Sequence, residues 1–141
     1  MFSEAAPGQG AEAGAIAHAL VNRALDRTHT YAGIKNTGSL FTDVQAQATS
    51  ADVQGTGNSQ YADAMKFIES GKGLDPVQEK QFNLVTGQAE AAYTGKSSDP
   101  TGGATFWDHP PSTPGQGASK KYCAPVTTTT VGTASFAKCS K

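Results

Sequence analysis

The strongest constraint on the fold is a helical repeat of apolar residues near the start of the chain. The stretch AEAGAIAHALVNRALD, from Ala11 to Asp26, carries apolar residues every four positions, with further apolar residues beside them: Ile16, Leu20 and Ala24, then Ala17, Val21 and Leu25. This spacing predicts a helix with one apolar face. Because that face must be buried, other elements have to pack against it.

Other segments also have helical signals. Asp75 is placed to cap a helix, Pro76 suits its first position and Gln78 completes a capping box, so we expect a helix from Pro76 to Gly95. A further helix is expected over residues 60–70, between a polar cap and Gly71. A short helical turn is expected near residues 40–44, where Leu40, Phe41 and Val44 supply the apolar anchors.

The end of the chain has a different pattern. The threonine-rich run APVTTTTVGTASFAK has a Gly-Thr break in its middle and predicts a β-hairpin. A length of 141 residues fits a single domain, residues 1–141. We therefore expect a mainly α domain of the α+β class, with a small C-terminal β-hairpin.

Cys123 and Cys139 flank this hairpin. They can form a disulfide, remain as two thiols or supply half of a metal site. A zinc site needs more ligands nearby, and the closest histidine is His109. We favour the disulfide, which would close a loop of about 15 residues, contribute about 3 kcal/mol in the chain-entropy model and imply an oxidising compartment.

Composition excludes several classes of function. The formal net charge is −1 and no apolar run approaches the roughly 18 residues that span a bilayer, so neither nucleic-acid binding nor membrane insertion is expected. The sequence contains no phosphate loop, zinc motif or nucleophile elbow, and we expect no cofactor. The first residues lack the basic and apolar regions of a secretory signal.

Few side chains stand out as chemical candidates. Glu4, in SEAAPGQG, is either a solvated glutamate or a general acid whose pKa rises in an apolar site. Glu12 falls in the first turn of the first helix, where a negative charge complements the helix dipole. We expect His18 to be packed, and we expect His29 to be exposed in a loop. Asp26 is expected to be solvated or a local hydrogen-bond partner.

The stretch DPTGGATFW, Asp99 to Trp107, combines a sharp turn with adjacent aromatic residues. Asp99 is expected to bind the backbone of its own turn. The stretch is either a tight turn that leads into a core strand or a surface that holds a flat ligand. In the second case, consecutive glycines allow the ligand to lie close to the backbone, and one of Phe106 and Trp107 can stack on it while the other joins the core. Asp108 and His109 continue the run and are candidates for facing a ligand.

Three of these stretches together resemble the cell-wall hydrolase family that contains the spore cortex-lytic enzymes. EAAPGQGAEAGAIAHALVNR, from Glu4 to Arg23, is similar to the opening signature of that family, which ends in Asn-Arg. Gln60-Tyr61 resembles a Gln-Phe pair, and DPTGGATFW resembles the strongest motif of the family. The resemblance covers residues 4–109, so the Pro-rich segment and hairpin of residues 110–141 lie outside it.

The resemblance implies a lysozyme-like fold that cleaves the β-1,4 bond between N-acetylmuramic acid and N-acetylglucosamine in peptidoglycan. It implies that Glu4 is the catalytic acid, which suits the chemistry of protonating a glycosidic oxygen. The expected substrate-binding residues are Gln60, Tyr61, Thr101, Gly102, Gly103, Phe106, Trp107 and His109. Hydrolysis also calls for a second carboxylate, and the candidates for it are Glu12 and Asp108.

Two departures from the family leave alternatives open. Gly8 and Gln9 stand where many relatives carry another glutamate, and only three residues precede Glu4 where the family builds a helix. We therefore expect this chain to be the C-terminal domain of a longer protein. Without a second carboxylate, the enzyme would be a lytic transglycosylase that gives anhydro products. A non-catalytic peptidoglycan-binding module is a further alternative.

The expected setting follows from the implied substrate. A peptidoglycan glycosidase acts in the periplasm or outside the cell, and a chain without a signal has to be delivered by a secretion system, by phage lysis machinery or within a longer chain. An antibacterial effector of this kind would also have an immunity or inhibitor protein as a partner.

Overall fold

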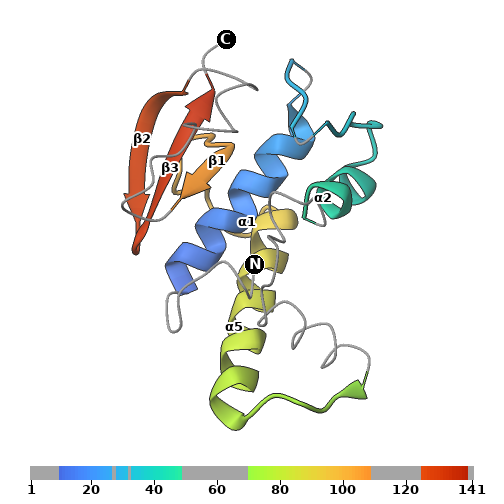
Figure 1. The fold of residues 1–141 in the computed structure, drawn as a ribbon, viewed down its shortest axis with the longest axis vertical. Helices are drawn as coiled ribbons and strands as arrows, with labels where there is room; N and C mark the ends of the chain where they lie inside the picture. Colours follow the sequence, from blue (N-terminus) through green and yellow to red (C-terminus); the bar gives the residue numbers. More distant parts are fainter. Residues whose placement is uncertain (1–9, 27, 32, 49–69, 109–124, 140–141) are drawn as a thin grey trace.

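The computed structural model describes residues 10–26, 28–31, 33–48, 70–108 and 125–139. Within these residues the fold is mixed, with three helices and one three-stranded antiparallel sheet (Figure 1). The elements are α1 (Gly10–Leu25), α2 (Leu40–Ala48), α5 (Pro76–Tyr93), β1 (Phe106–Asp108), β2 (Pro125–Val131) and β3 (Ala134–Cys139). This architecture agrees with the expected α+β class.

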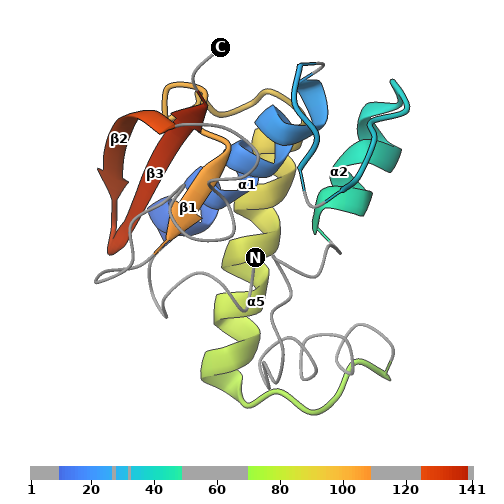
Figure 2. The ribbon, with the colours of Figure 1, turned by 45° about the horizontal axis from the view of Figure 1, so that its top comes forward.

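Helix α1 occupies the centre of the molecule, with the sheet on one side and α2 on the other (Figures 1 and 2). Every residue from position 12 to position 20 is buried, so burial extends beyond the single apolar face that the sequence predicted. The small alanine and glycine residues on its remaining surface explain the difference, because they let α5 approach closely. Gly14 is one such position, since a Cβ there would lie 2.9 Å from Oε1 of Gln88.

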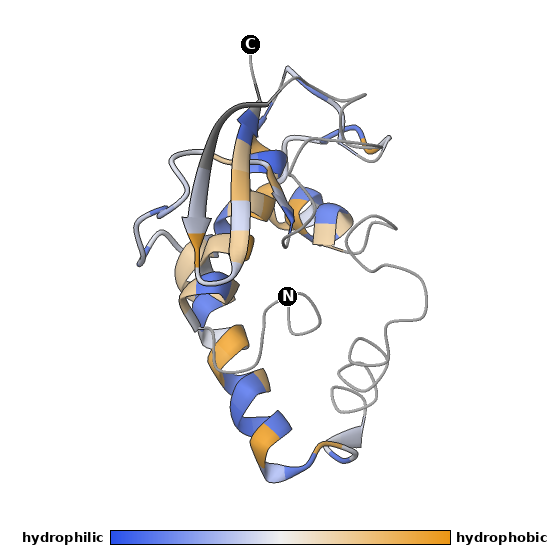
Figure 3. Cartoon of the chain, turned by 60° about the vertical axis from the view of Figure 1, so that its left-hand side comes forward, coloured by the Kyte–Doolittle hydropathy of each residue, from blue (hydrophilic) through white to orange (hydrophobic). Residues whose placement is uncertain are grey.

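Helix α5 begins as the sequence predicted and ends two residues earlier, at Tyr93. The Asp75 side chain accepts a hydrogen bond from the backbone of Gln78, whose side chain in turn accepts one from the Asp75 backbone, and Pro76 occupies the first turn. The first part of the helix extends away from the sheet and α1, and it displays both hydrophobic and hydrophilic residues (Figure 3). Val77 is 77% exposed there.

Helix α2 is longer than the predicted turn. Its first turn contains Asp43, a buried carboxylate that accepts hydrogen bonds from the backbone N–H groups of Thr37 and Gly38 and from the Thr37 hydroxyl. These bonds fix the loop that leads into α2. The helix expected at residues 60–70 lies almost wholly outside the described residues.

The C-terminal hairpin forms as predicted, with β2 antiparallel to β3 and Gly132 in the turn at φ +62°. Strand β3 also pairs with β1, so the sheet order is β1-β3-β2 and Trp107 lies opposite Phe136. From the sequence, the hairpin is expected to be separate from the aromatic stretch. The two belong to one sheet, because β1 supplies backbone hydrogen bonds to the open edge of β3.

A buried core connects the sheet to the helices. Phe136 of β3 packs with the apolar side of α1, with Val85 of α5 and with Ala104, which precedes β1. The hairpin turn is also tied to the beginning of α1. Oε2 of the fully buried Glu12 accepts hydrogen bonds of 2.8 Å from both the N–H and the hydroxyl of Thr133.

The expected disulfide stays a prediction. Cys123 lies outside the described residues, and so does the side chain of Cys139. No helix in the described part of the chain is long and apolar enough to cross a membrane.

Candidate functional site

Asn22 connects α1 to the turn that precedes β1. Its Nδ2 donates to Oδ2 of Asp99 and to the carbonyl oxygen of Ala104, each at 2.9 Å. These partners lie 77 and 82 residues further along the chain. The Asn-Arg end of α1 and the Asp-Pro-Thr-Gly-Gly-Ala turn therefore form one structural unit.

Asp99 organises this turn, as the sequence predicted. Its Oδ1 accepts hydrogen bonds from the N–H and the hydroxyl of Thr101, and its Oδ2 accepts one from the N–H of Gly103. Burial alone would raise the pKa of Asp99, but the hydrogen bonds from Thr101, Asn22 and Gly103 outweigh it and hold the pKa below its ordinary value. The carboxylate therefore remains charged and keeps the turn closed.

The buried side chain of Arg23 also connects α1 to the segment that contains the glycine turn and β1. It is only 4% exposed, and its Nε donates to the carbonyl oxygen of Thr105. The guanidinium carbon lies 4.8 Å from the ring centroid of Trp107 and 5.4 Å from those of Tyr31 and Phe106. Such distances permit cation–π attraction, which is strongest where the cation is removed from water.

The two adjacent aromatics have different environments. Phe106 is 2% exposed and packs edge to face on Tyr31, so it is the core residue of the pair and is removed from the expected substrate contacts. Trp107 is half-buried, with Arg23 over its ring. Thr101 is also buried, and its hydroxyl is occupied by Asp99 and by the N–H of Ala104. Its role in this structure is to hold the turn.

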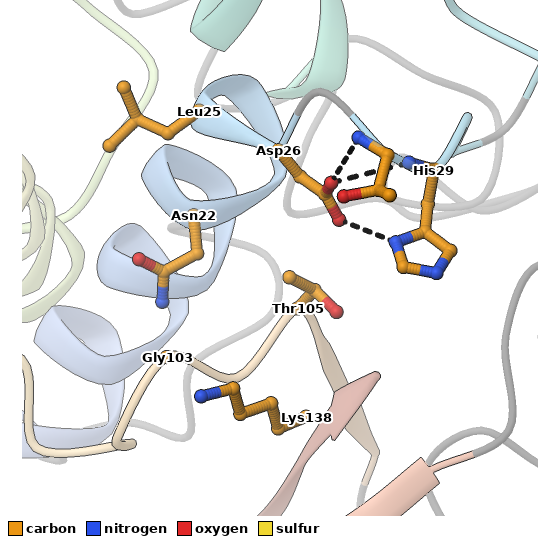
Figure 4. Close-up of a pocket in the computed structure, with 8 residues that line it drawn as sticks. Asn22, Leu25, Asp26, His29, Gly103, Thr105 and Lys138 are labelled. Atoms are coloured by element: carbon orange, nitrogen blue, oxygen red, sulfur yellow. Dashed lines mark hydrogen bonds and ion pairs between the residues drawn. The ribbon is translucent and has the colours of Figure 1, made fainter. Parts of the chain in front are cut away.

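An open pocket of about 310 Å³ lies beside this unit, at the C-terminal end of α1 (Figure 4). Its wall combines the end of α1 and the following loop, the glycine turn and strand β3. The residues that line it are Asn22, Leu25, Asp26, Thr28, His29, Gly103, Thr105 and Lys138.

Asp26 is the most heavily hydrogen-bonded group of the pocket. Its Oδ1 accepts from the N–H groups of Thr28 and His29, and its Oδ2 accepts from the Tyr31 hydroxyl and lies 2.9 Å from Nδ1 of His29. Burial would raise the pKa of Asp26, but the hydrogen bonds from Tyr31, Thr28 and His29 prevail and lower it well below its ordinary value. Burial, together with the bond to Asp26, strongly raises the pKa of the Tyr31 hydroxyl.

This geometry corrects the prediction for His29. The sequence predicted an exposed loop residue, but its side chain is 19% exposed and is held by Asp26 inside the pocket. The loop folds back because Asp26 binds the backbone N–H groups of the residues that follow it. His18, in contrast, is packed as expected, with Nε2 2.9 Å from the Ser97 hydroxyl.

The two glycines of the turn differ in what surrounds them. Both have positive φ, +66° at Gly102 and +92° at Gly103, which favours glycine at each position. The space at Gly102 is open, whereas a Cβ at Gly103 would lie 3.6 Å from Cε and Nζ of Lys138. The room predicted for a ligand is therefore available at Gly102, and at Gly103 it is occupied by a lysine of the hairpin.

The remaining predicted residues have the following positions. Glu4, Gln60, Tyr61 and His109 lie outside the described residues, so their roles stay predictions. Glu12 is fully buried on Thr133, which agrees with the structural role given to it from its place in the first turn. Asp108 ends β1 and is half-buried, and it is the more accessible of the two candidates for a second carboxylate.

Sequence reasoning missed Asp26, His29 and Lys138 as a group. The Asp-x-x-His spacing directly after a helix was the signal for the first two, since Asx turns place the side chain of Asp near residues two and three positions later. No local sequence pattern connects Lys138 with Asp26 and His29. Within the described residues, no group of three or more His, Cys, Asp or Glu side chains could hold a metal ion.

Comparison of the chain with protein-family models, with curated proteins and with solved structures found no match.

Proposed function

We propose that this protein is a peptidoglycan glycosidase of the spore cortex-lytic type, with a lysozyme-like fold. In this proposal it cleaves the β-1,4 bond between N-acetylmuramic acid and N-acetylglucosamine, and Glu4 acts as the general acid. The proposed place of action is the periplasm or the outside of the cell, where peptidoglycan is found.

One observation carries the proposal. The resemblance to the cell-wall hydrolases rests on separate stretches of sequence, and two of them meet through the side chain of Asn22. A chance similarity of short motifs gives no reason for their residues to bind each other across 77 positions. In a shared ancestral site the motif residues would serve one structure, and we would expect them to meet.

The chemistry is that of a carboxylic acid that protonates the glycosidic oxygen as the bond to the leaving sugar breaks. Asp108 is the candidate second carboxylate, and it is the one at the end of β1 that keeps partial contact with solvent. The adjoining turn offers the open backbone at Gly102, and Trp107 is the aromatic residue that retains exposed surface.

The test is mass spectrometry of the fragments released from purified peptidoglycan by the wild-type protein, by Glu4→Gln and by Glu79→Gln. Glu79 is exposed in the first turn of α5, so its substitution makes the same chemical change away from the motifs. We expect reducing muropeptides from the wild type and from Glu79→Gln, and a loss of about 100-fold or more in Glu4→Gln, since general acid catalysis contributes about that much.

The products distinguish the alternatives. Anhydro-muropeptides would assign the protein to the lytic transglycosylases and retain Glu4 as the acid. Absence of fragments from the wild type would refute the glycosidase. Full activity in Glu4→Gln would refute the role of Glu4.

A further inference from the structure

We propose that the pocket at the end of α1 binds the C-terminal residue of a short peptide, with Lys138 as the residue that recognises the carboxylate. The site combines a cation that none of the described residues engages, an oriented hydrogen-bond acceptor and an apolar side chain. Its identification with the peptide stem of peptidoglycan rests on the proposed function, whereas the peptide site itself does not.

Lys138 supplies the positive charge. Its side chain crosses Gly103, which brings Nζ over the glycine turn and into the wall of the pocket (Figure 4). No hydrogen bond or ion pair engages this ammonium group within the part of the chain that the structure describes. The buried cation nearby, Arg23, is already engaged by Thr105 and three aromatic rings. An anionic ligand group in the pocket would therefore meet Lys138.

The acid in the pocket, Asp26, is engaged by its own neighbours. Its two oxygens together accept hydrogen bonds from the backbone N–H groups of Thr28 and His29, from Nδ1 of His29 and from the Tyr31 hydroxyl. Four donors fill the acceptor capacity of one carboxylate. Asp26 therefore acts as a positioning residue for its neighbours, and among the described residues no ion pair joins it to Lys138.

His29 supplies the acceptor. Because Nδ1 lies 2.9 Å from Asp26, the neutral ring carries its proton on Nδ1 and presents the lone pair of Nε2. Asn22 lines the same pocket, with its Nδ2 engaged by Asp99 and Ala104. A cation with a nearby acceptor matches a residue that offers a carboxylate and an amide N–H.

Leu25 and the dimensions of the pocket complete the match. Leu25 is 54% exposed at the pocket wall, so it offers an apolar contact to a small side chain such as a methyl group. A volume of about 310 Å³ holds an amino-acid residue together with its carboxylate and amide. The terminal alanine of a peptidoglycan stem has this chemistry.

The test is a titration of the ¹⁵N-labelled protein with N-acetyl-D-alanyl-D-alanine, followed through the backbone amide shifts of Thr28, Gly103 and Thr105. The same dipeptide with a C-terminal amide is the matched ligand, since it lacks only the carboxylate. We expect the acid to shift these amides and to bind about tenfold more tightly than the amide, because a hydrogen bond to a charged group typically contributes that much.

Two variants test whether Lys138 causes the tighter binding of the acid. Lys138→Gln should weaken binding of the acid about tenfold and leave the amide unchanged, and Lys138→Arg should restore most of the loss. Lys80→Gln removes an equal charge from exposed α5 and should have no effect. Equal binding of acid and amide, no binding of either, or equal effects of Lys138→Gln and Lys80→Gln would overturn the proposal.

The experiment separates this inference from the proposed function. Binding needs no bond cleavage, so Glu4→Gln should bind the dipeptide as the wild type does. A protein that binds the acid through Lys138 but releases no glycan fragments keeps the peptide site and loses the glycosidase. A protein that releases fragments without binding the dipeptide keeps the glycosidase and loses the peptide site.

Discussion

The contact of Asn22 with the glycine turn can be broken by a single substitution, Asn22→Ala. The change removes one donor group that serves two acceptors, Oδ2 of Asp99 and the carbonyl oxygen of Ala104, both at 2.9 Å. The helix itself should be retained, because alanine has the highest helix propensity. The substitution therefore isolates the junction between the two motifs.

The expected cost follows from these two bonds. A hydrogen bond to a charged group contributes about 1.5–3 kcal/mol and a neutral one about 1 kcal/mol. Asp99 keeps its bonds from Thr101 and Gly103, and water can reach the partly buried carboxylate, so the lower values apply. We expect the free energy of unfolding to fall by about 2–3 kcal/mol.

The assay is urea unfolding followed by the fluorescence of Trp107, the single tryptophan of the chain. This residue is half-buried beside the junction, and it reports on the region that is perturbed. With a urea m-value of about 2 kcal/mol per molar, the midpoint should fall by about 1–1.5 M. Asn83→Ala, at an exposed position of α5, is the control for the change in helix propensity.

A loss in Asn22→Ala of less than about 0.5 kcal/mol relative to Asn83→Ala would refute the reasoning, because surface substitutions have effects of that size. A double-mutant cycle with Asp99→Ala refines the result. The coupling energy between positions 22 and 99 should be about 1 kcal/mol, since contacting residues in one network couple by such amounts. Additive effects would show that the bond contributes no stability.

Three further substitutions test stability. The folded-state pKa of Asp26 lies below the unfolded value of about 3.9, so its contribution is present above that pH and is lost as the pH falls through the folded-state value. Asp26→Asn should therefore lower the urea midpoint at pH 7 and flatten its decline from pH 4 to pH 2.5; an unchanged pH profile would contradict the lowered pKa. Gly87→Ala should stabilise exposed α5 by about 0.5–1 kcal/mol, because a Cβ there has open space. Gly103→Ala should destabilise by about 1–2 kcal/mol, because φ is +92°. Thermal unfolding measures both, and equal signs would refute the distinction.

Much of the fold could be read from local patterns. The capping box at Asp75 and Gln78, the helical spacing that begins at Ala11 and the threonine-rich hairpin all predicted elements that the structure contains. Each signal lies within a few residues of the structure it specifies. The asparagine and the aspartate of the motifs could also be identified, but the bond between them could not, because nothing in their immediate sequence names a partner 77 positions away.

The sequence by itself determined the first helix, the capped start of α5 and the hairpin with its glycine turn. Only the tertiary structure decided that β1 pairs with β3, that Glu12 holds the turn at Thr133 and that Lys138 crosses Gly103. It also decided which aromatic residue is core and turned an apparent loop histidine, His29, into a pocket residue. The physical reason is that capping, periodicity and turn geometry are satisfied within a few residues, whereas burial and side-chain partners depend on which distant segments the closed chain brings together.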